Sequence, residues 1–291
     1  MPTRRDALLG GLALASCTPN ARSVVHRDEP RFAALEGRIG GRVGVAALNT
    51  GSGEWITHRA NERFAMCSTF KWLLAAHMLY LDMHMPGFRE QRVMFSDSDL
   101  LDYAPIAREN LARGWMTVEE MSAAIVVASD NTCANLLLVG AGGPEGLTHF
   151  FRSNGDSVTR LDRTEPALNE NTPGDERDTT VPDAMVRTMQ RFLLGDRVLN
   201  PASRERLIGW MIDCRTGRER LRAGLPADWR AGDKTGTSVE AHNATADVAI
   251  AWPPGRAPIL IAAYLSDSSV ELSARNAAHA EIARLVAERW S

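Results

Sequence analysis

The sequence predicts an α/β protein of the α+β kind, in which an antiparallel sheet is flanked by helices and an all-helical lobe is inserted. Segments typical of strands lie near both ends of the 291-residue chain, segments typical of helices fill the middle, and no segment repeats. The sheet is therefore expected to be built from both chain ends. We expect one domain over residues 31–291, with a sheet lobe (31–60 and 213–291) and a helical lobe (61–212).

The first elements of the sheet lobe are predicted to be a helix and a hairpin. Residues 31–39 have the pattern of a short helix, and the Val and Ala content of residues 42–49 suits a strand. The Thr-Gly-Ser-Gly sequence at 50–53 is turn chemistry, so the chain is expected to return as a second strand over 54–58.

The middle of the chain carries helix signals. Thr117 and Glu120 have the spacing of a capping box and predict a helix that runs to Val127. Asn131 is expected to cap the next helix. The helices predicted in this lobe cover 72–81, 117–127, 132–139, 144–153, 180–194 and 200–212. Residues 161–180 are rich in charge, Pro and Asn without periodicity, and they predict a long loop.

The C-terminal part of the chain is predicted to complete the sheet. Residues 234–237 are expected on a strand, where alternate side chains share a face. Residues 244–252 and 258–266 predict two further strands, joined by a Pro-Pro-Gly turn, and residues 273–290 predict a closing amphipathic helix.

The composition describes an ordinary soluble globular protein. The apolar content is 44%, the charged content is 24% and the net charge is −3, so no basic excess points to nucleic acid. The seven histidines show neither His-x-His nor His-Glu-x-x-His spacing, and no Gly-x-Ser-x-Gly elbow occurs. We therefore expect no metal and no cofactor.

The first 17 residues predict an export signal that is not part of the fold. An arginine pair at 4–5 precedes an apolar stretch over 7–15 that is too short to span a bilayer, which is typical of a twin-arginine signal. Leu-Ala-Ser-Cys at 14–17 resembles a bacterial lipobox, in which Cys17 becomes acylated after cleavage; a plain cleaved signal is the alternative. Residues 18–30 predict a polar tether. We expect a protein of the periplasm or cell envelope, exported and lipid-anchored through Cys17.

Beyond Cys17 the chain has three cysteines, at 67, 133 and 214. Their number is odd and their spacing does not suggest zinc. We expect no obligatory disulfide, which suits a protein exported already folded from a reducing cytoplasm.

Ser68 and Lys71 form a Ser-x-x-Lys pair at the start of a predicted helix, where residues three apart share a face. Only two of the 33 basic residues are lysines, Lys71 and Lys234; the other 31 are arginines. Lysine can lose its proton and arginine cannot usefully do so. The two lysines therefore indicate positions where arginine would fail, and Ser68 is a candidate nucleophile.

Four motifs together resemble the class A serine β-lactamases over about residues 30–291. They are Ser68-Thr69-Phe70-Lys71, Ser129-Asp130-Asn131, Glu165-Pro166-Ala167-Leu168-Asn169 and Lys234-Thr235-Gly236, in the family's order and roughly its spacing. The resemblance implies the β-lactamase/transpeptidase-like fold and hydrolysis of penicillins and cephalosporins by a monomer, and so antibiotic resistance.

The resemblance also implies roles for the acyl-transfer residues. A serine needs a base within hydrogen-bond reach, and Lys71 or Glu165 could serve; which of them takes the proton stays open. Ser129 would relay a proton to the lactam nitrogen with Lys234 beside it. The ester on Ser68 would be hydrolysed by a water held by Glu165 and Asn169.

Further residues are implied in substrate binding and in support of the site. The backbone N–H groups of Ser68 and Thr237 would hold the oxyanion. The other members are Asn131 for the substrate amide; Lys234, Thr235, Gly236, Thr237 and Arg220 around its carboxylate; Arg163 and Asp178 as an ion pair across the loop; and Tyr103, which is either an aromatic gate or an ordinary half-buried tyrosine.

Two rival functions fit most of these motifs, although the Glu165-to-Asn169 motif argues against the first. A D-Ala-D-Ala peptidase of this fold would lack the deacylating Glu165, and a tethered β-lactam sensor would acylate and stop. Cys67, Thr237 and Arg220 look like the carbapenem-hydrolysing branch, but Ser238 stands where that branch has its second cysteine. Carbapenem turnover therefore stays open.

Overall fold

A computed structural model describes residues 26–28, 30–238 and 243–291. The export signal and most of the predicted tether lie outside these residues. The strands are β1 (His26–Asp28), β2 (Arg42–Asn49), β3 (Trp55–His58), β4 (Phe64–Ala65), β5 (Arg92–Met94), β6 (Trp115–Thr117), β7 (Thr179–Thr180), β8 (Arg230–Thr237), β9 (Thr245–Trp252) and β10 (Ile259–Ser266). The α-helices are α1 (Pro30–Ile39), α2 (Phe70–His84), α3 (Pro105–Glu109), α4 (Val118–Val127), α5 (Asn131–Gly140), α6 (Gly143–Ser153), α7 (Pro182–Met189), α8 (Pro201–Ile212), α9 (Leu221–Gly224) and α10 (Leu272–Trp290).

Short helical turns complete the described elements. They are the 3-10 turns η1 (Cys67–Thr69), η2 (Asp97–Asp99), η3 (Leu111–Arg113) and η4 (Ala167–Asn169), and the π-helical turn η5 (Gln190–Leu194). No helix of the described residues is long and apolar enough to cross a membrane.

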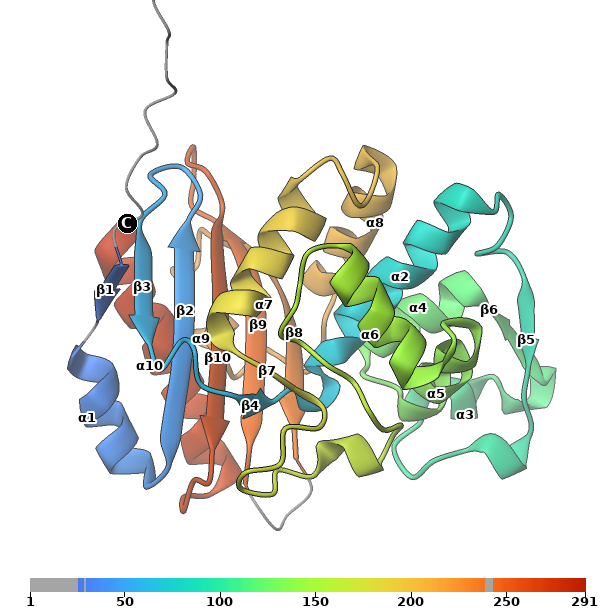
Figure 1. Ribbon diagram of the computed structural model, residues 1–291, viewed down its shortest axis with the longest axis horizontal. Coiled ribbons are helices and arrows are strands. Elements are labelled where there is room, and N and C mark those ends of the chain that lie inside the picture. Colours follow the sequence, from blue (N-terminus) through green and yellow to red (C-terminus); the bar gives the residue numbers. More distant parts are fainter. Residues whose placement is uncertain (1–25, 29, 239–242) are drawn as a thin grey trace, which may run out of the picture.

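The main sheet has the order β1-β3-β2-β10-β9-β8, so strands from both chain ends lie side by side (Figure 1). The N-terminal hairpin β2–β3 is as predicted, and β10 pairs antiparallel with β2 along its whole length. Strand β8 lies at the edge of the sheet, next to the helical lobe. The predicted assembly of the sheet from the two termini is confirmed.

Strand β1 corrects two predictions. Residues 26–28 were expected in an irregular tether, but they pair with β3, and they pair parallel to it in a sheet expected to be antiparallel. Strand pairing uses backbone groups that every residue except proline carries in full. A three-residue polar strand at a sheet edge therefore leaves no hydrophobic pattern in the sequence.

The two faces of the sheet bury different side chains because successive residues of a strand point to opposite faces. On β2, Val43, Val45 and Ala47 pack in one core with α1 and α10, whereas Ala46 and Leu48 belong to the core shared with the helical lobe. Burying one large aliphatic side chain contributes about 1.5–3 kcal/mol. The sheet is therefore stabilised from both sides.

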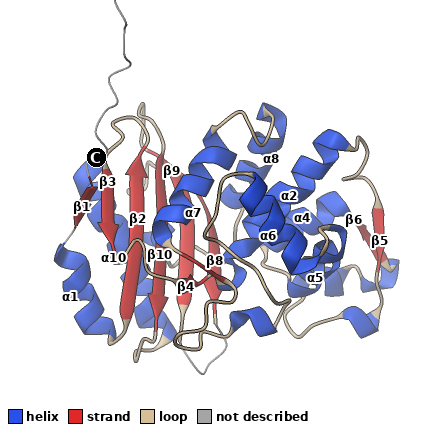
Figure 2. Ribbon diagram, in the orientation of Figure 1, coloured by secondary structure: helices blue, strands red, loops and turns tan. Residues whose placement is uncertain are grey.

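Helix α2 is the centre of the helical lobe, and Ser68 lies in the turn η1 that leads directly into it. Every residue from Phe70 to Leu79 is buried, because α4, α5, α6 and α8 surround the helix. A helix that is apolar all round is expected to be buried in this way. Figure 2 shows these helices gathered on one side of the molecule and the main sheet on the other.

Helix α7 packs on β2 and β10, although residues 61–212 were predicted to form a separate helical lobe. Its buried side chains include Met185, Val186 and Met189. The lobe boundary is therefore wrong for this helix, because an amphipathic pattern predicts a buried face without saying which element covers it.

The capping prediction is confirmed at α4 and wrong at α5, and the predicted start of α7 is two residues too early. Thr117 and Glu120 form the predicted capping box at α4. At α5 the cap is Asp130, whose carboxylate accepts from the Cys133 N–H at 2.9 Å, and the predicted cap Asn131 is the first helical residue. Thr180 belongs to β7, so α7 begins only at Pro182.

Candidate active site

Ser68 lies in η1, at the entry to α2, on a turn that the backbone strains. Cys67 before it has φ of +44°, a left-handed value that is costly for a non-glycine residue and is found mostly at functional sites. Gly236 of β8 passes so close that a Cβ there would come 2.6 Å from Met66 O and 3.1 Å from Ser68 N. Glycine at 236 therefore lets the strand approach the nucleophile's backbone.

Lys71 is fully buried one turn after Ser68. Its Nζ lies 2.8 Å from Glu165 Oε1 and donates to Ser129 O at 2.8 Å and to Asn131 Oδ1 at 2.5 Å. Burial lowers the pKa of Lys71, while the Glu165 carboxylate opposes that shift. A buried charge needs such partners, so this network fixes the amine beside the serine.

Glu165 brings the nucleophile and the long loop into contact. Ser68 Oγ donates to Glu165 Oε1 at 3.3 Å, and Asn169 Nδ2 donates a short hydrogen bond to Oε2. The other amide atom, Asn169 Oδ1, is buried and has no hydrogen-bond partner among residues 26–28, 30–238 and 243–291. A buried polar atom without a partner marks a place for a polar ligand such as water.

Asn135 holds Glu165 in place and was missed by the sequence reasoning. Its side chain accepts from Glu165 N and donates to Glu165 O, both at 2.9 Å. The residue lies on α5, four positions after Asn131 and therefore on the same helix face. That spacing was the available signal.

The predicted ion pair between Arg163 and Asp178 closes the two ends of the loop. Arg163 Nε donates to Asp178 Oδ2 at 2.6 Å, and the backbone N–H groups of Asp162 and Arg163 donate to Oδ1 at 2.7 and 3.0 Å. Asp178 is fully buried with φ of +58°. The paired carboxylate thus compensates a strained backbone at the neck of the loop.

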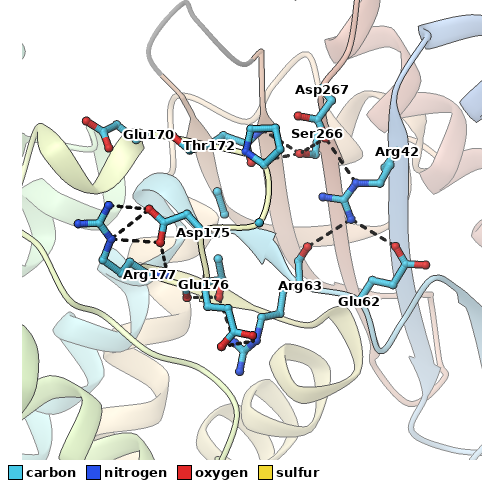
Figure 3. Close-up of a pocket in the computed structure, with 15 residues that line it drawn as sticks. Arg42, Glu62, Arg63, Glu170, Thr172, Asp175, Glu176, Arg177, Ser266 and Asp267 are labelled. Atoms are coloured by element: carbon cyan, nitrogen blue, oxygen red, sulfur yellow. Dashed lines mark hydrogen bonds and ion pairs between the residues drawn. The ribbon is translucent and has the colours of Figure 1, made fainter.

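The later part of the loop, residues 170–177, lines a cavity of about 450 Å³ that is rich in paired charges (Figure 3). Arg63 donates to Thr179 Oγ1 at 3.0 Å and lies 3.6 Å from Glu176, and Arg177 pairs with Asp175 at 2.7 Å. The contacts of Arg63 attach this end of the loop to the segment just before β4. They were not predicted, because they depend on how the loop folds back on the sheet.

Ser129 and Lys234 face each other across the site. Ser129 has φ of +59°, and its Oγ accepts from Lys234 Nζ at 3.0 Å and from Lys71 Nζ at 3.5 Å. Burial, together with repulsion from Lys71, lowers the pKa of Lys234 to about 8. The two lysines of the chain therefore meet at one hydroxyl.

Arg220 lies behind β8 and is only 5% exposed. Its guanidinium donates to Thr237 Oγ1 at 2.7 Å and to the backbone carbonyl of Gly236 at 2.6 Å. Thr216, which the sequence reasoning missed, shares a hydrogen bond of 2.5 Å with Thr235 Oγ1. The segment that carries Thr216 and Arg220 thus presents hydrogen-bond donors to the same cavity as strand β8.

Two buried aspartates hold the segment that carries Arg220. Asp247 accepts from the Leu221 N–H at 3.0 Å, and Asp233 forms a short ion pair with Arg222. Burial raises the pKa of both carboxyls. Neither aspartate was predicted, since nothing in the local sequence shows that these strand positions face a loop rather than apolar side chains.

A cavity of about 400 Å³ joins these groups. The predicted residues that line it are Ser68, Tyr103, Ser129, Asn131, Asn169, Arg220, Thr235, Gly236 and Thr237. Lys71, Glu165 and Lys234 lie fully buried behind this lining. Tyr103 is 51% exposed at the rim, and its carbonyl accepts from the Asn131 N–H at 3.0 Å.

Three cysteines of the described chain, Cys67, Cys133 and Cys214, are free and buried. Burial raises the pKa of the Cys67 thiol to about 12. A thiol of that pKa is a poor nucleophile at neutral pH, so Cys67 is a packing residue beside Ser68. Among the described residues, no three His, Cys, Asp or Glu side chains are placed to hold a metal ion.

Acyl transfer through a serine ester requires a base that can accept the proton of the serine hydroxyl. Here a buried carboxylate accepts directly from that hydroxyl and is itself bonded to a buried amine. The fold and the site together define a serine acyl-transfer enzyme.

Comparison with known proteins identifies the family of serine acyl-transfer enzymes to which this chain belongs. The model of the "Beta-lactamase enzyme family" matches residues 29–290. The chain is 46% identical over 260 residues to "Beta-lactamase AST-1" of Nocardia asteroides (89% of this chain, 83% of that protein) and 45% identical over 280 residues to "Beta-lactamase L2" of Stenotrophomonas maltophilia (96% and 90%). The structure of an ancestral (GNCA) class A β-lactamase matches with a TM-score of 0.86 at 52% identity, covering 90% of this chain and 99% of that one. The chain belongs to the class A serine β-lactamase family.

Proposed function

We propose that this protein hydrolyses β-lactams through an ester on Ser68 that a water activated by Glu165 removes, and that it thereby confers resistance to these antibiotics. The observation that carries the proposal is the position of Glu165. One carboxylate oxygen accepts from Ser68 and lies against Lys71, and the other accepts from Asn169, whose free amide oxygen is buried beside it. The same carboxylate thus serves both halves of the reaction.

In the first half, Ser68 Oγ attacks the lactam carbonyl and its proton passes to Glu165. The 3.3 Å hydrogen bond to Oε1 supports Glu165 as the acceptor, because Lys71 Nζ is engaged by Ser129, Asn131 and this carboxylate. Backbone N–H groups of Ser68 and Thr237 hold the oxyanion. One such donor is worth about 3 kcal/mol.

Ring opening then requires a proton on the lactam nitrogen. Ser129 Oγ–H donates it as the C–N bond breaks, Lys71 returns a proton to Ser129, and Lys71 regains one from Glu165. Glu165 is left as a carboxylate again. In the second half it takes a proton from water, the hydroxide attacks the ester, and Ser68 leaves with that proton.

The substrate carboxylate is bound by the positive end of the cavity. Thr235 and Thr237 supply hydroxyls, while Lys234 and Arg220 supply charge from behind them. Residues of a single chain supply the nucleophile, its proton-transfer partners and the carboxylate-binding groups, so the site needs no residue from a second copy, and we propose that a monomer is the active form. A light-scattering mass twice that of one mature chain would contradict this.

Steady-state hydrolysis of a chromogenic cephalosporin tests the proposal. Continued turnover is expected, because Glu165 and Asn169 give the ester a route to water. A single equivalent of product would instead indicate a sensor that acylates and stops. Cleavage of a D-Ala-D-Ala peptide without lactam turnover would indicate the peptidase.

The charge of Lys234 predicts a pH dependence. As the pH rises through about 8, the ammonium loses its proton, so carboxylate binding weakens. For benzylpenicillin we expect KM to rise about 10-fold between pH 7 and about pH 9.5. Lys234→Arg, which keeps its charge, is expected to bind well at pH 7 and to lose this rise. An equal rise in the variant would assign the titration to another group.

We also propose export through the twin-arginine pathway and a lipid anchor on Cys17. Support comes from the sequence of residues 1–17, which lie outside the described residues. The protein is expected in the membrane fraction of its host, and Cys17→Ser is expected to move it to the soluble fraction. Wild-type protein found only in the soluble fraction would favour a plain cleaved signal.

A further inference from the structure

Arg220 is a buried cation held by neutral groups. Besides Thr237 and Gly236, its guanidinium donates to Ala246 O at 2.9 Å and to Asn276 Oδ1 at 2.9 Å. Carboxylates lie near it in Asp247 and Asp233, but none forms an ion pair with it among the described residues. The position of this guanidinium therefore depends on the exact placement of neutral acceptors.

His279 of α10 is an unused polar group beside these acceptors. It is fully buried; its Nε2 lies 3.1 Å from Thr245 Oγ1 and shares a hydrogen bond with it, and its Nδ1 has no hydrogen-bond partner in the described part of the chain. Burial, together with repulsion from Arg220 and Arg275, lowers the pKa of His279 well below its ordinary value. The ring is therefore neutral at physiological pH.

A buried imidazole with one unpaired nitrogen is less favourable for stability than a hydrocarbon of similar size. The neighbouring residues Ala278, Ile282 and Ala283 are all apolar and belong to the core under the sheet. A leucine would suit this position better on stability grounds alone. What the imidazole adds is the hydrogen bond to Thr245.

Thr245 connects His279 to the carboxylate end of the cavity. It opposes Thr237 in the β8–β9 pair, and the next carbonyl along β9, that of Ala246, accepts from Arg220. Asn276, which binds Arg220 Nε directly, lies three residues before His279 and so on the same face of α10. One face of α10 thus touches Arg220 both directly and through β9.

We propose that His279 is a positioning residue. It fixes Thr245, and through Thr245 it fixes the Ala246 carbonyl and the guanidinium of Arg220, so that Arg220 is correctly placed to bind the carboxylate of the β-lactam. This inference rests on the proposed role of Arg220. It assigns to His279 an effect on binding of the carboxylate and none on proton transfer at Ser68.

Kinetics and melting of His279→Leu test the inference. KM for benzylpenicillin is expected to rise about 3- to 10-fold with kcat within about twofold, because only binding common to ground and transition state is lost. The melting temperature is expected to stay the same or to rise by a few degrees, about the effect of 1 kcal/mol in a chain of this length. His279→Met serves in the same way if the leucine variant does not fold.

Two matched variants separate positioning from packing. His279→Gln can return an amide nitrogen to the place of Nε2 and is expected to restore a KM close to that of wild type. Thr245→Val is expected to raise KM as His279→Leu does, and the double variant no further, because both changes remove one contact. An unchanged KM in His279→Leu, or a fall in melting temperature and kcat together, would overturn the proposal. If Arg220→Ala leaves KM unchanged, the carboxylate role of Arg220 fails instead.

Discussion

Glu165→Ala is expected to react once with a penicillin and then almost stop. The variant keeps Ser68, Lys71 and Ser129, but it loses the carboxylate that would take a proton from the hydrolytic water. General-base catalysis contributes about 100- to 10,000-fold, so kcat should fall by about 1000-fold. Stopped-flow measurement with a chromogenic cephalosporin should show a burst of one equivalent and then a slow steady rate.

Glu165→Gln is the matched control for this result. The glutamine retains a carbonyl oxygen for the Asn169 amide but cannot accept a proton, so it should also accumulate ester. Because Ser68 donates to Glu165 directly, both variants should also form the ester more slowly than wild type. A burst that forms at the wild-type rate would show that Lys71 is the acceptor in acylation.

Lys71→Arg is expected to lower kcat/KM by about 1000-fold although it preserves the positive charge. The proton circuit requires Lys71 both to give a proton to Ser129 and to take one from Glu165, and a guanidinium does not lose its proton. The amine is also fully enclosed, so a larger head group must displace Asn131 or Glu165. The acylation rate and the melting temperature should be measured on the same preparation.

Lys234→Arg is the internal comparison, because Lys234 is proposed to supply charge rather than to relay a proton. At pH 7 it should lose far less activity than Lys71→Arg. Equal losses in two well-folded variants would contradict this division of roles between the two lysines. Near-wild-type activity in Lys71→Arg would remove Lys71 from the proton circuit.

The sequence predicted the parts of this fold that depend on local pattern and spacing. The β2–β3 hairpin, the capping box at Thr117 and the closing helix each carry their signal within a few residues. The strand at 26–28 and the placement of α7 on the sheet were missed or misassigned, because backbone pairing at an edge and the choice of a packing partner are tertiary properties. The cap of α5 was misplaced by one residue between two good cap formers, Asp130 and Asn131.

The same division between local sequence signals and tertiary properties applies to the active site. Residues that lie in short motifs, such as Ser68, Lys71 and Glu165, were found from the sequence and meet in one place. Residues that act by holding others were missed, as with Asn135 on the backbone of Glu165 and His279 behind Arg220. Their partners are 30 or more residues away in the chain, so the local sequence does not show which groups they hold, although the spacing of Asn135 from Asn131 places it on the site face of α5.

The central claim is that the β-lactam becomes bound to Ser68 and that Glu165 releases it. The most direct test is mass analysis of wild type and Glu165→Ala after mixing with benzylpenicillin, followed by peptide mapping. We predict that the variant gains the mass of one penicillin on the peptide containing Ser68, while wild type returns to its free mass as the penicillin is consumed. An adduct on another residue, or an adduct that persists in wild type, would contradict the account.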